Sequence, residues 1–178
     1  MTPFLTIGTI DIYLYPVAPG TEPRQLRERA AVAAMIEAVF GPGTSLAHTD
    51  TGAPVLPGRP ETISVSHSRT TAAIAIDRAG AHPGIDIEDA RPQLMRVAGR
   101  VLSARELDAY GASADTLAEA WTLKEAAYKS AGTAGLDFRR DIVLPEPGAG
   151  FMTAAGMRLD ILYSGTVGSE HLALVYRK

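Results

Sequence analysis

Gly84-Ile85-Asp86-Ile87-Glu88 is the stretch that decides the fold of this chain and the place of its chemistry. Apolar and acidic residues alternate along it, which predicts a β-strand, because successive side chains of a strand point to opposite faces. Ile85 and Ile87 are therefore expected to pack in a core, while Asp86 and Glu88 project together from the other face. Neighbouring carboxylates repel one another unless a cation or a proton lies between them. Taken alone, the pair fits either an exposed strand face or an oxygen-ligand site for a divalent cation, which suits Mg²⁺ better than Zn²⁺.

Upstream of this strand, the sequence predicts one half of a fold. We expect a strand, a helix, a long irregular loop and two more strands, at residues 6–15, 24–40, 41–61, 62–66 and 71–76. The helix follows from apolar residues at three- and four-residue spacing, and Gly41-Pro42 ends it. The loop holds four prolines and four glycines. Loops of this length tend to be functional or mobile.

Downstream of the strand, the same order of elements returns. We expect three helices, at residues 92–102, from Ser103 and at 114–131. Three strands follow, at residues 141–144, 157–163 and 171–177. Ser103-x-x-Glu106 is a capping box, which marks the start of a helix. The two halves meet near residue 83. The sequence therefore predicts an α+β fold in a single domain, 1–178, with two pseudo-symmetric lobes, about 1–83 and 84–178, each with helices packed on a small antiparallel sheet.

Composition excludes several classes of protein. The 178 residues suit one domain, and the net charge of −3 argues against a general nucleic-acid binder. Without cysteine, the chain has no disulfide, thiolate metal site or cysteine nucleophile. We see no signal-peptide pattern and no long apolar run, so we expect a cytoplasmic protein that does not enter a membrane. Only Lys124, Lys129 and Lys178 are lysines, against 14 arginines, which suggests either a need for ammonium groups at two nearby positions or a bias of composition.

Two further segments carry candidate functional residues. In the segment from Trp121 to Lys129, Glu125 and Lys129 lie four residues apart on the predicted helix, which fits a surface ion pair as well as a site. We expect Trp121 to lie in the core rather than to stack on a cofactor. The segment Ser66-His67-Ser68 ends a strand, where a histidine can be structural or bind an anion. No Gly-x-Ser-x-Gly elbow, phosphate-binding P-loop or paired-histidine zinc motif occurs.

In this order, Ser-His-Ser, Gly-Ile-Asp-Ile-Glu and Trp-x-x-Lys-Glu-Ala-x-x-Lys resemble the 4′-phosphopantetheinyl transferase superfamily. The resemblance is to its Sfp-type, single-chain branch, and it covers about residues 52 to 135. It implies the fold of that superfamily, with coenzyme A in the cleft between two lobes. It also implies transfer of phosphopantetheine from coenzyme A to a serine of a carrier protein, with release of 3′,5′-ADP.

The resemblance assigns roles in catalysis. Asp86, Glu88 and Glu125 would bind Mg²⁺, which also grips the diphosphate of coenzyme A. Either Glu125 or a metal-bound water would take the proton of the carrier serine. Lys129 would contact the α-phosphate, and Lys124 would hold phosphate or the neighbouring carboxylates.

The resemblance also assigns residues to the binding of coenzyme A. Ser66 and His67 would bind phosphate oxygens, and Gly52 and Pro54 would border the adenine. Ala53 stands where the family carries a lysine, so Arg59, Arg24, Arg27 or Arg29 would have to replace that cation. Arg24 takes the place of a family arginine that binds the 3′-phosphate, although a solvated helix face would account for these arginines equally well.

The expected partner is an acidic acyl or peptidyl carrier protein. Arg96 and Arg100 share a helix face and would form the docking surface together with Arg91 and Arg105, unless they are ordinary exposed arginines. Since both lobes belong to one chain, we expect a monomer. Two other functions fit fewer of the residues: a coenzyme A- or nucleotide-binding protein of the same fold without transferase activity, and a metal-dependent phosphoesterase.

Overall fold

The N-terminal half of the chain, residues 1–81, is a small sheet with one helix. We describe residues 1–177 of a computed structural model, and Lys178 lies outside the described residues. The four strands pair in the order β1 (Leu5–Ile7), β2 (Ile10–Pro16), β6 (Thr71–Asp77) and β5 (Thr62–His67), and every pair is antiparallel. Helix α1 (Arg24–Phe40) packs on this sheet through an apolar stripe that includes Val32, Met35 and Ile36. The expected helix at 24–40 is thus confirmed.

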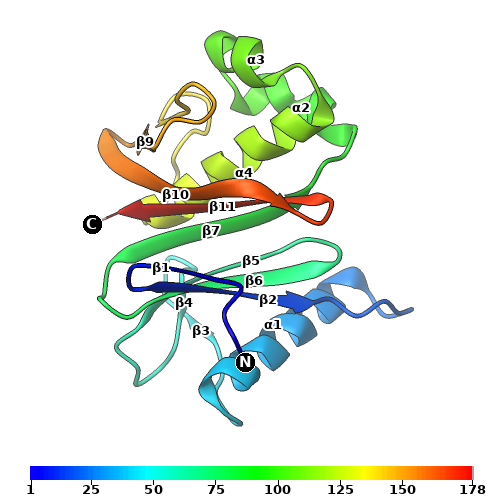
Figure 1. Ribbon diagram of the computed structural model, residues 1–178, viewed down its shortest axis with the longest axis vertical. Helices are drawn as coiled ribbons and strands as arrows, with labels where there is room; N and C mark the ends of the chain where they lie inside the picture. The colour runs from blue at the N-terminus through cyan, green and yellow to red at the C-terminus, as the bar shows by residue number, and fades with distance from the viewer. Residues whose placement is uncertain (178) are drawn as a thin grey trace.

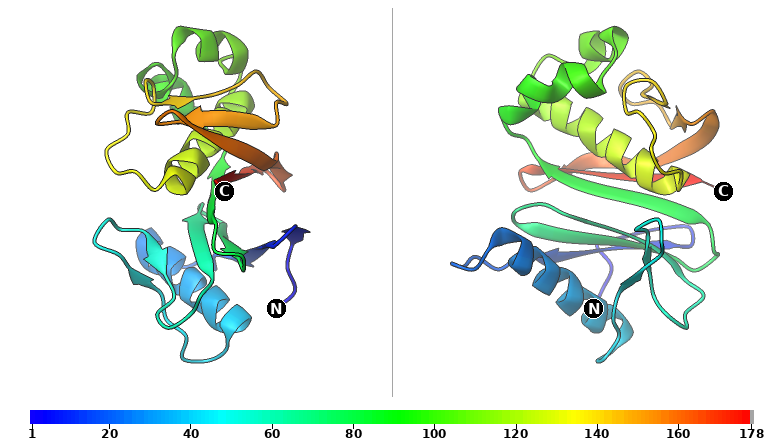
Figure 2. Two further views of the ribbon diagram at one scale, coloured as in Figure 1. Left: turned by 90° about the vertical axis from the view of Figure 1, so that its left-hand side faces the viewer. Right: turned by 180° about the vertical axis from the view of Figure 1, so that it is seen from behind.

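The C-terminal half, from residue 82, is a larger version of the same plan (Figure 1). Its antiparallel strands pair in the order β7 (His82–Asp89), β11 (Glu170–Arg177), β10 (Met157–Val167), β9 (Phe151–Ala154) and β8 (Ile142–Val143). The long helix α4 (Ala114–Ala131) packs on this sheet, and the shorter helices α2 (Gln93–Val101) and α3 (Ala104–Tyr110) pack on α4. The two turned views show α4 on the side of the upper sheet away from the viewer of Figure 1 (Figure 2).

The two halves repeat one topology. In each, a strand leads to a helix, and a hairpin follows whose second strand pairs beside the first. The N-terminal order is therefore β2-β6-β5, and the C-terminal order is β7-β11-β10. This confirms the expected α+β fold with two pseudo-symmetric lobes.

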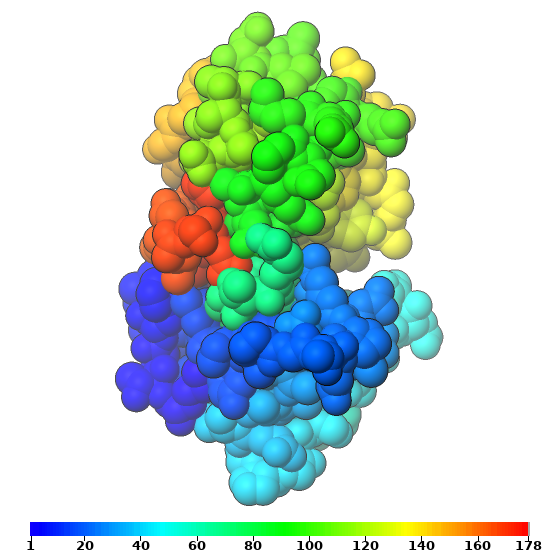
Figure 3. All heavy atoms as spheres, turned by 90° about the vertical axis from the view of Figure 1, so that its right-hand side faces the viewer, coloured from blue at the N-terminus to red at the C-terminus, as the bar shows by residue number. Residues whose placement is uncertain are grey.

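The sheets meet along a shared apolar core. Ile85 and Ile87 of β7 are 0% and 2% exposed and pack with apolar residues of β2, β6 and β11. This confirms the face predicted for both isoleucines. At one end of the contact, the turn between β5 and β6 lies between the two halves (Figure 3). There the hydroxyls of Ser68, Thr70 and Thr71 donate to the buried carboxylate of Glu170, so the turn is tied to the start of β11.

The structure corrects two of the expected segments. Residues 6–15 are not one strand, because Gly8 adopts a φ of +59° in the turn between β1 and β2, a conformation that glycine takes without strain. The loop 41–61 is not wholly irregular, since β3 (Ala47–His48) and β4 (Pro54–Val55) pair within it. Strand β9 was not expected at all.

The predicted helix start at Ser103 is confirmed. Its side chain accepts a hydrogen bond from the backbone N–H of Glu106, and the Glu106 carboxylate accepts from the N–H of Ser103. Helix α4 begins with a similar reciprocal cap between Ser113 and Thr116. Among residues 1–177, no helix combines the length and the apolar character needed to cross a membrane.

Candidate active site

A cavity of about 1300 Å³ lies between the two halves. Helix α1, the β3–β4 segment and β5 border it on one side, and β7, α4 and the turn after α4 border it on the other. The left-hand view of Figure 2 shows these segments facing one another. Most of the predicted site residues line it: Gly52, Pro54, Ser66, His67, Asp86, Glu88, Glu125 and Lys129.

Close packing of α4 on β7 brings the two acidic motifs together. A Cβ atom at Gly84 would lie 1.9 Å from the carbonyl oxygen of Ala126 and 2.7 Å from the backbone nitrogen of Ser130. Only a glycine allows the helix backbone to approach the strand this closely. The glycine of the Gly-Ile-Asp-Ile-Glu stretch thus sets the distance between the Asp86–Glu88 pair and Glu125.

Asp86 is held from both sides of the cavity. Its Oδ1 atom accepts a hydrogen bond from the hydroxyl of Ser66 at 2.6 Å and one from the Lys129 ammonium at 2.8 Å. Lys129 also donates to the carbonyl oxygen of Ile85 at 2.9 Å. Within the described residues, Oδ2 of Asp86 accepts no hydrogen bond. Ser66 therefore gives its only proton to Asp86 here, rather than facing the cavity with a free donor.

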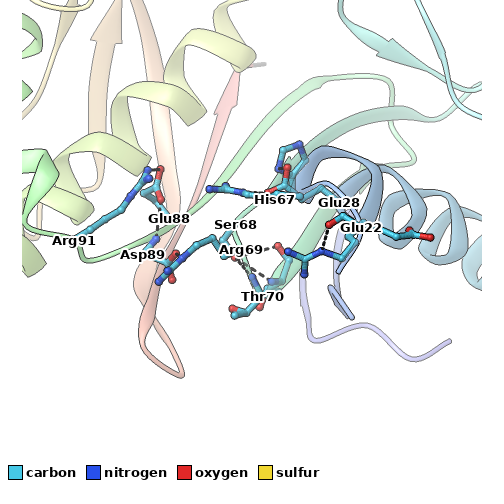
Figure 4. A network of polar contacts seen from close by, with 12 residues as sticks. Glu22, Glu28, His67, Ser68, Arg69, Thr70, Glu88, Asp89 and Arg91 are labelled. Carbon is cyan, nitrogen blue, oxygen red and sulfur yellow. Dashed lines mark hydrogen bonds and ion pairs between the residues drawn. The ribbon is translucent and has the colours of Figure 1, made fainter. Parts of the chain in front are cut away.

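Glu88 and Glu125 are two further acidic residues of the cavity lining. Arg91 donates to Oε2 of Glu88 at 2.7 Å, as Figure 4 shows. Burial raises the pKa of Glu88, with a smaller contribution from Asp86, although Arg91 opposes the shift. Burial also raises the pKa of Glu125, and the negative charges of Asp86 and Glu88 add to this against the effect of Lys129. In the part of the chain that the structure describes, the Glu125 carboxylate has no hydrogen bond or ion pair.

The carboxylates of Asp86, Glu88 and Glu125 are suitable ligands for a divalent cation, but their side chains are not arranged around a common point. Among residues 1–177, no three Asp, Glu or His side chains lie close enough together to hold a metal ion. Asp86 and Glu88 are instead bonded to Lys129 and Arg91. A hard cation prefers carboxylate oxygens, and here Oδ2 of Asp86 and both oxygens of Glu125 are left without donors. Their mutual repulsion is the force that a cation would relieve.

The predicted phosphate ligands His67 and Arg24 meet through a third residue. His67 lies at the end of β5, with Nδ1 3.5 Å from the Oε2 atom of the buried Glu28 on α1. Arg24 bonds the same carboxylate from one helical turn away. Figure 4 places Glu28 and His67 side by side. Arg24 does not line the cavity, so its predicted contact with a phosphate is not supported by this arrangement.

The structure places Lys124 apart from the other predicted site residues. This residue is fully buried in the C-terminal half, outside the cavity lining. Its ammonium donates to the carbonyl oxygens of Phe138 and Ile142 at 2.6 Å each and lies 2.9 Å from Oε1 of Glu106. All three protons have an acceptor, so none is left for a phosphate. The ion pair joins α3 to the middle of α4, and the two hydrogen bonds join the segment after α4 to the same point.

The cavity lining also includes Arg29, which the sequence offered as a replacement cation, and three residues to which the sequence gave no role in the site: His48, Trp121 and Tyr128. Arg29 of α1 and His48 of β3 are exposed cationic or titratable side chains on its N-terminal side. Trp121 and Tyr128 of α4 line its other side, although Trp121 was expected to be a core residue. Tyr128 stacks on Phe138 at 5.5 Å between ring centroids, and Trp121 packs in the core as well. Helical spacing could have placed both aromatic side chains in the cavity, because Trp121 lies four residues before Glu125 and Tyr128 three residues after it, on the same helix face.

The four arginines proposed for docking separate into two groups. Arg91 bonds Glu88, and Arg105 bonds Glu146 at 2.7 Å. Arg96 and Arg100 of α2 are exposed, with no ion pair to any described residue, and Met95 beside them is 52% exposed. Of these four arginines, only the two on α2 are therefore without an ion pair to a described residue.

Comparison with known proteins agrees with this geometry. Residues 83–171 match the family model described as the 4′-phosphopantetheinyl transferase superfamily. The match spans half of the 178 residues and contains β7 except its first residue, all of α4 and the residues Asp86, Glu88, Glu125 and Lys129. No curated protein matches the chain. The extent of the family match shows that the chain belongs to the 4′-phosphopantetheinyl transferase superfamily.

Proposed function

We propose that the protein transfers the 4′-phosphopantetheine group of coenzyme A to a serine hydroxyl of an acyl or peptidyl carrier protein and releases 3′,5′-ADP. The single observation that carries the proposal is the convergence of Asp86, Glu88, Glu125 and Lys129 on one cavity within the segment that matches the superfamily. The cavity volume of about 1300 Å³ leaves room for a nucleotide-sized ligand.

In this proposal, the serine oxygen attacks the phosphorus that carries pantetheine. The bond from that phosphorus to the bridging oxygen breaks, and this oxygen leaves with 3′,5′-ADP. Catalysis of such a transfer depends on positioning and on neutralising charge. Lys129, 27% exposed at the cavity, would stabilise charge on the leaving phosphate. Glu125, whose carboxylate lines the cavity and has no hydrogen bond within the described residues, would accept the serine proton, directly or through a water.

We propose Mg²⁺ as the cofactor, held by Asp86, Glu88 and Glu125. Bound Mg²⁺ would supply charge neutralisation at the diphosphate. Glu88 would have to leave Arg91, and Asp86 would offer the Oδ2 atom that has no donor. His67, at the end of β5, would bind a phosphate oxygen, with Gly52 and Pro54 beside the adenine.

The activity is tested with coenzyme A, Mg²⁺ and a panel of apo carrier proteins. We expect one phosphopantetheine to be added to a carrier serine, detected by intact-mass spectrometry, and an equal amount of 3′,5′-ADP. Glu125→Gln should abolish transfer and keep the fold, as judged by thermal unfolding. No mass gain on any carrier, combined with calorimetric binding of coenzyme A, would instead support the binding protein without transferase activity.

For the carrier, we propose docking on α2 by a monomeric enzyme. Arg96 and Arg100 lie one turn apart and are free to meet the acidic surface of a carrier protein. Reversing both charges to Glu should raise the KM for the carrier about 10-fold and leave coenzyme A binding unchanged. An unchanged KM would place the docking surface elsewhere.

A further inference from the structure

Two serines of β5 join the halves of the molecule. The backbone N–H of Ile85 donates to the Ser64 hydroxyl at 3.0 Å, and that of Ile87 donates to the Ser66 hydroxyl at 3.4 Å. The serine two residues later in β5 bonds the isoleucine two residues later in β7, so the two strands run in the same direction. In residues 1–177 no ladder of backbone hydrogen bonds pairs these strands, which belong to separate sheets. Serine hydroxyls thus take the place of backbone acceptors along this contact.

Strand alternation puts both serines on this side of β5. Ile63 and Val65, the residues before each serine, pack into the core of the N-terminal half. Ser64 and Ser66 are 3% and 7% exposed, and each accepts one N–H from β7. As far as the contact between the halves is concerned, the two serines are equivalent.

They differ in one contact. The hydroxyl of Ser66 also donates to Oδ1 of Asp86 at 2.6 Å, a short hydrogen bond to a charged acceptor. Ser64 contacts no carboxylate among the described residues. With the Lys129 ammonium on the same oxygen, Ser66 occupies Oδ1 and leaves Oδ2 without a donor. The orientation of Asp86 therefore depends on a residue from the other half of the molecule.

We infer that Ser66 is a positioning residue that orients Asp86 for a divalent cation, and is not a phosphate ligand. The inference rests on the proposed function, because it concerns the cation of that same site. Hydrogen-bond partners of a metal ligand commonly change metal affinity 10- to 100-fold when removed. Since Ser66 belongs to the N-terminal half and Asp86 to the C-terminal half, the cation site is complete only when the halves are joined.

The test measures Mn²⁺ binding to the full-length protein in the presence of coenzyme A, by loss of the free Mn²⁺ signal in electron paramagnetic resonance. Without a carrier protein there is no turnover. Ser66→Ala should weaken Mn²⁺ binding about 10-fold. Ser64→Ala, the matched control, should change it by less than about twofold, although both variants lose one hydrogen bond between the halves and should lose similar thermal stability.

Two further variants separate orientation from packing. Ser66→Thr keeps the hydroxyl and should retain Mn²⁺ affinity, whereas Ser66→Cys has a similar size but a weak donor and should lose it. If Ser66→Ala does not fold, the Mn²⁺ affinities of Ser66→Thr and Ser66→Cys test the inference in its place. Equal Mn²⁺ affinity in the Ser66 and Ser64 variants would overturn the inference and leave the proposed function intact. Absence of Mn²⁺ binding by the wild-type protein would overturn it together with the proposed metal site.

Discussion

Lys124 and Lys129 lie five residues apart on one helix, yet they belong to two different polar networks. Lys124 is enclosed in the C-terminal half, and its ammonium has three protein acceptors at 2.6–2.9 Å. Lys129 faces the cavity, 27% exposed, and bonds the carboxylate of Asp86 and the carbonyl oxygen of Ile85. Lys124 therefore holds α4 to the elements packed beside it, whereas Lys129 is available to a ligand.

Geometry alone separates the two. An α-helix turns by about 100° per residue, so residues five apart point about 140° away from one another. Lys129, four residues after Glu125, shares the face of that carboxylate, and Lys124 does not. The same rule explains why a motif of neighbouring letters can hold both a site residue and a buried structural one.

The largest effect on stability is expected from removing Lys124. Lys124→Ala would leave the Glu106 carboxylate, 4% exposed, without its cation, and such losses cost about 3–5 kcal/mol. Chemical denaturation measures the change. The double variant Lys124→Met/Glu106→Gln should lose less than the sum of the single variants, because it removes both charges. A fully stable Lys124→Ala protein with impaired transfer would move Lys124 back to the active site.

Lys129→Ala should have the opposite profile. Loss of a cation at the leaving phosphate is expected to lower kcat about 100-fold, as for other preorganised electrostatic groups. The unfolding free energy should fall less than in Lys124→Ala, because Lys129 is 27% exposed and Asp86 keeps its hydrogen bond from Ser66. Lys129→Arg should also be impaired, since the planar guanidinium does not reproduce a compact ammonium. Wild-type turnover by Lys129→Arg would favour composition bias as the reason for the two lysines.

Gly84→Ala tests the close packing of α4 on β7. A Cβ atom there would clash with the backbone of α4, and relief of such overpacking typically costs about 1–3 kcal/mol. Because the helix must shift as a unit, transfer should fall more than in Gly99→Ala, where an added Cβ atom meets nothing within 4 Å. Circular dichroism melts and transfer rates of the two variants check this. Equal rates would show that the distance between α4 and β7 is not limiting.

A smaller effect is expected on the pH dependence of stability, through the buried pair Glu106–Lys124. Burial by itself would raise the pKa of Glu106, but the N–H groups of Leu144 and Ser103 and the Lys124 ammonium outweigh it and lower the pKa below 4.5. The unfolded state therefore binds more protons in that range, and stability falls as the pH falls. The stability difference between wild type and Glu106→Gln should be complete at neutral pH and shrink below about pH 4.5. A difference that does not change with pH would exclude a charged Glu106.

Local patterns in the sequence predicted most of the elements that carry the site. Alternation placed Asp86 and Glu88 opposite Ile85 and Ile87, and the capping box at Ser103 fixed a helix start. The turn at Gly8 was missed because the alternation continues across it. Burial of Lys124 could not be read from its neighbours, because its acceptors come from residues 14 and 18 positions later. The contact of Ser66 with Asp86 depends on two strands of different sheets, which no local pattern reports.

A crystal structure with coenzyme A and Mn²⁺ tests the contrast between the two lysines most directly. The account predicts anomalous density for Mn²⁺ beside Asp86 and Glu125, the diphosphate within reach of Lys129, and Lys124 still bonded to Glu106. A diphosphate bound to Lys124, or a nucleotide outside the cavity between the halves, would contradict it.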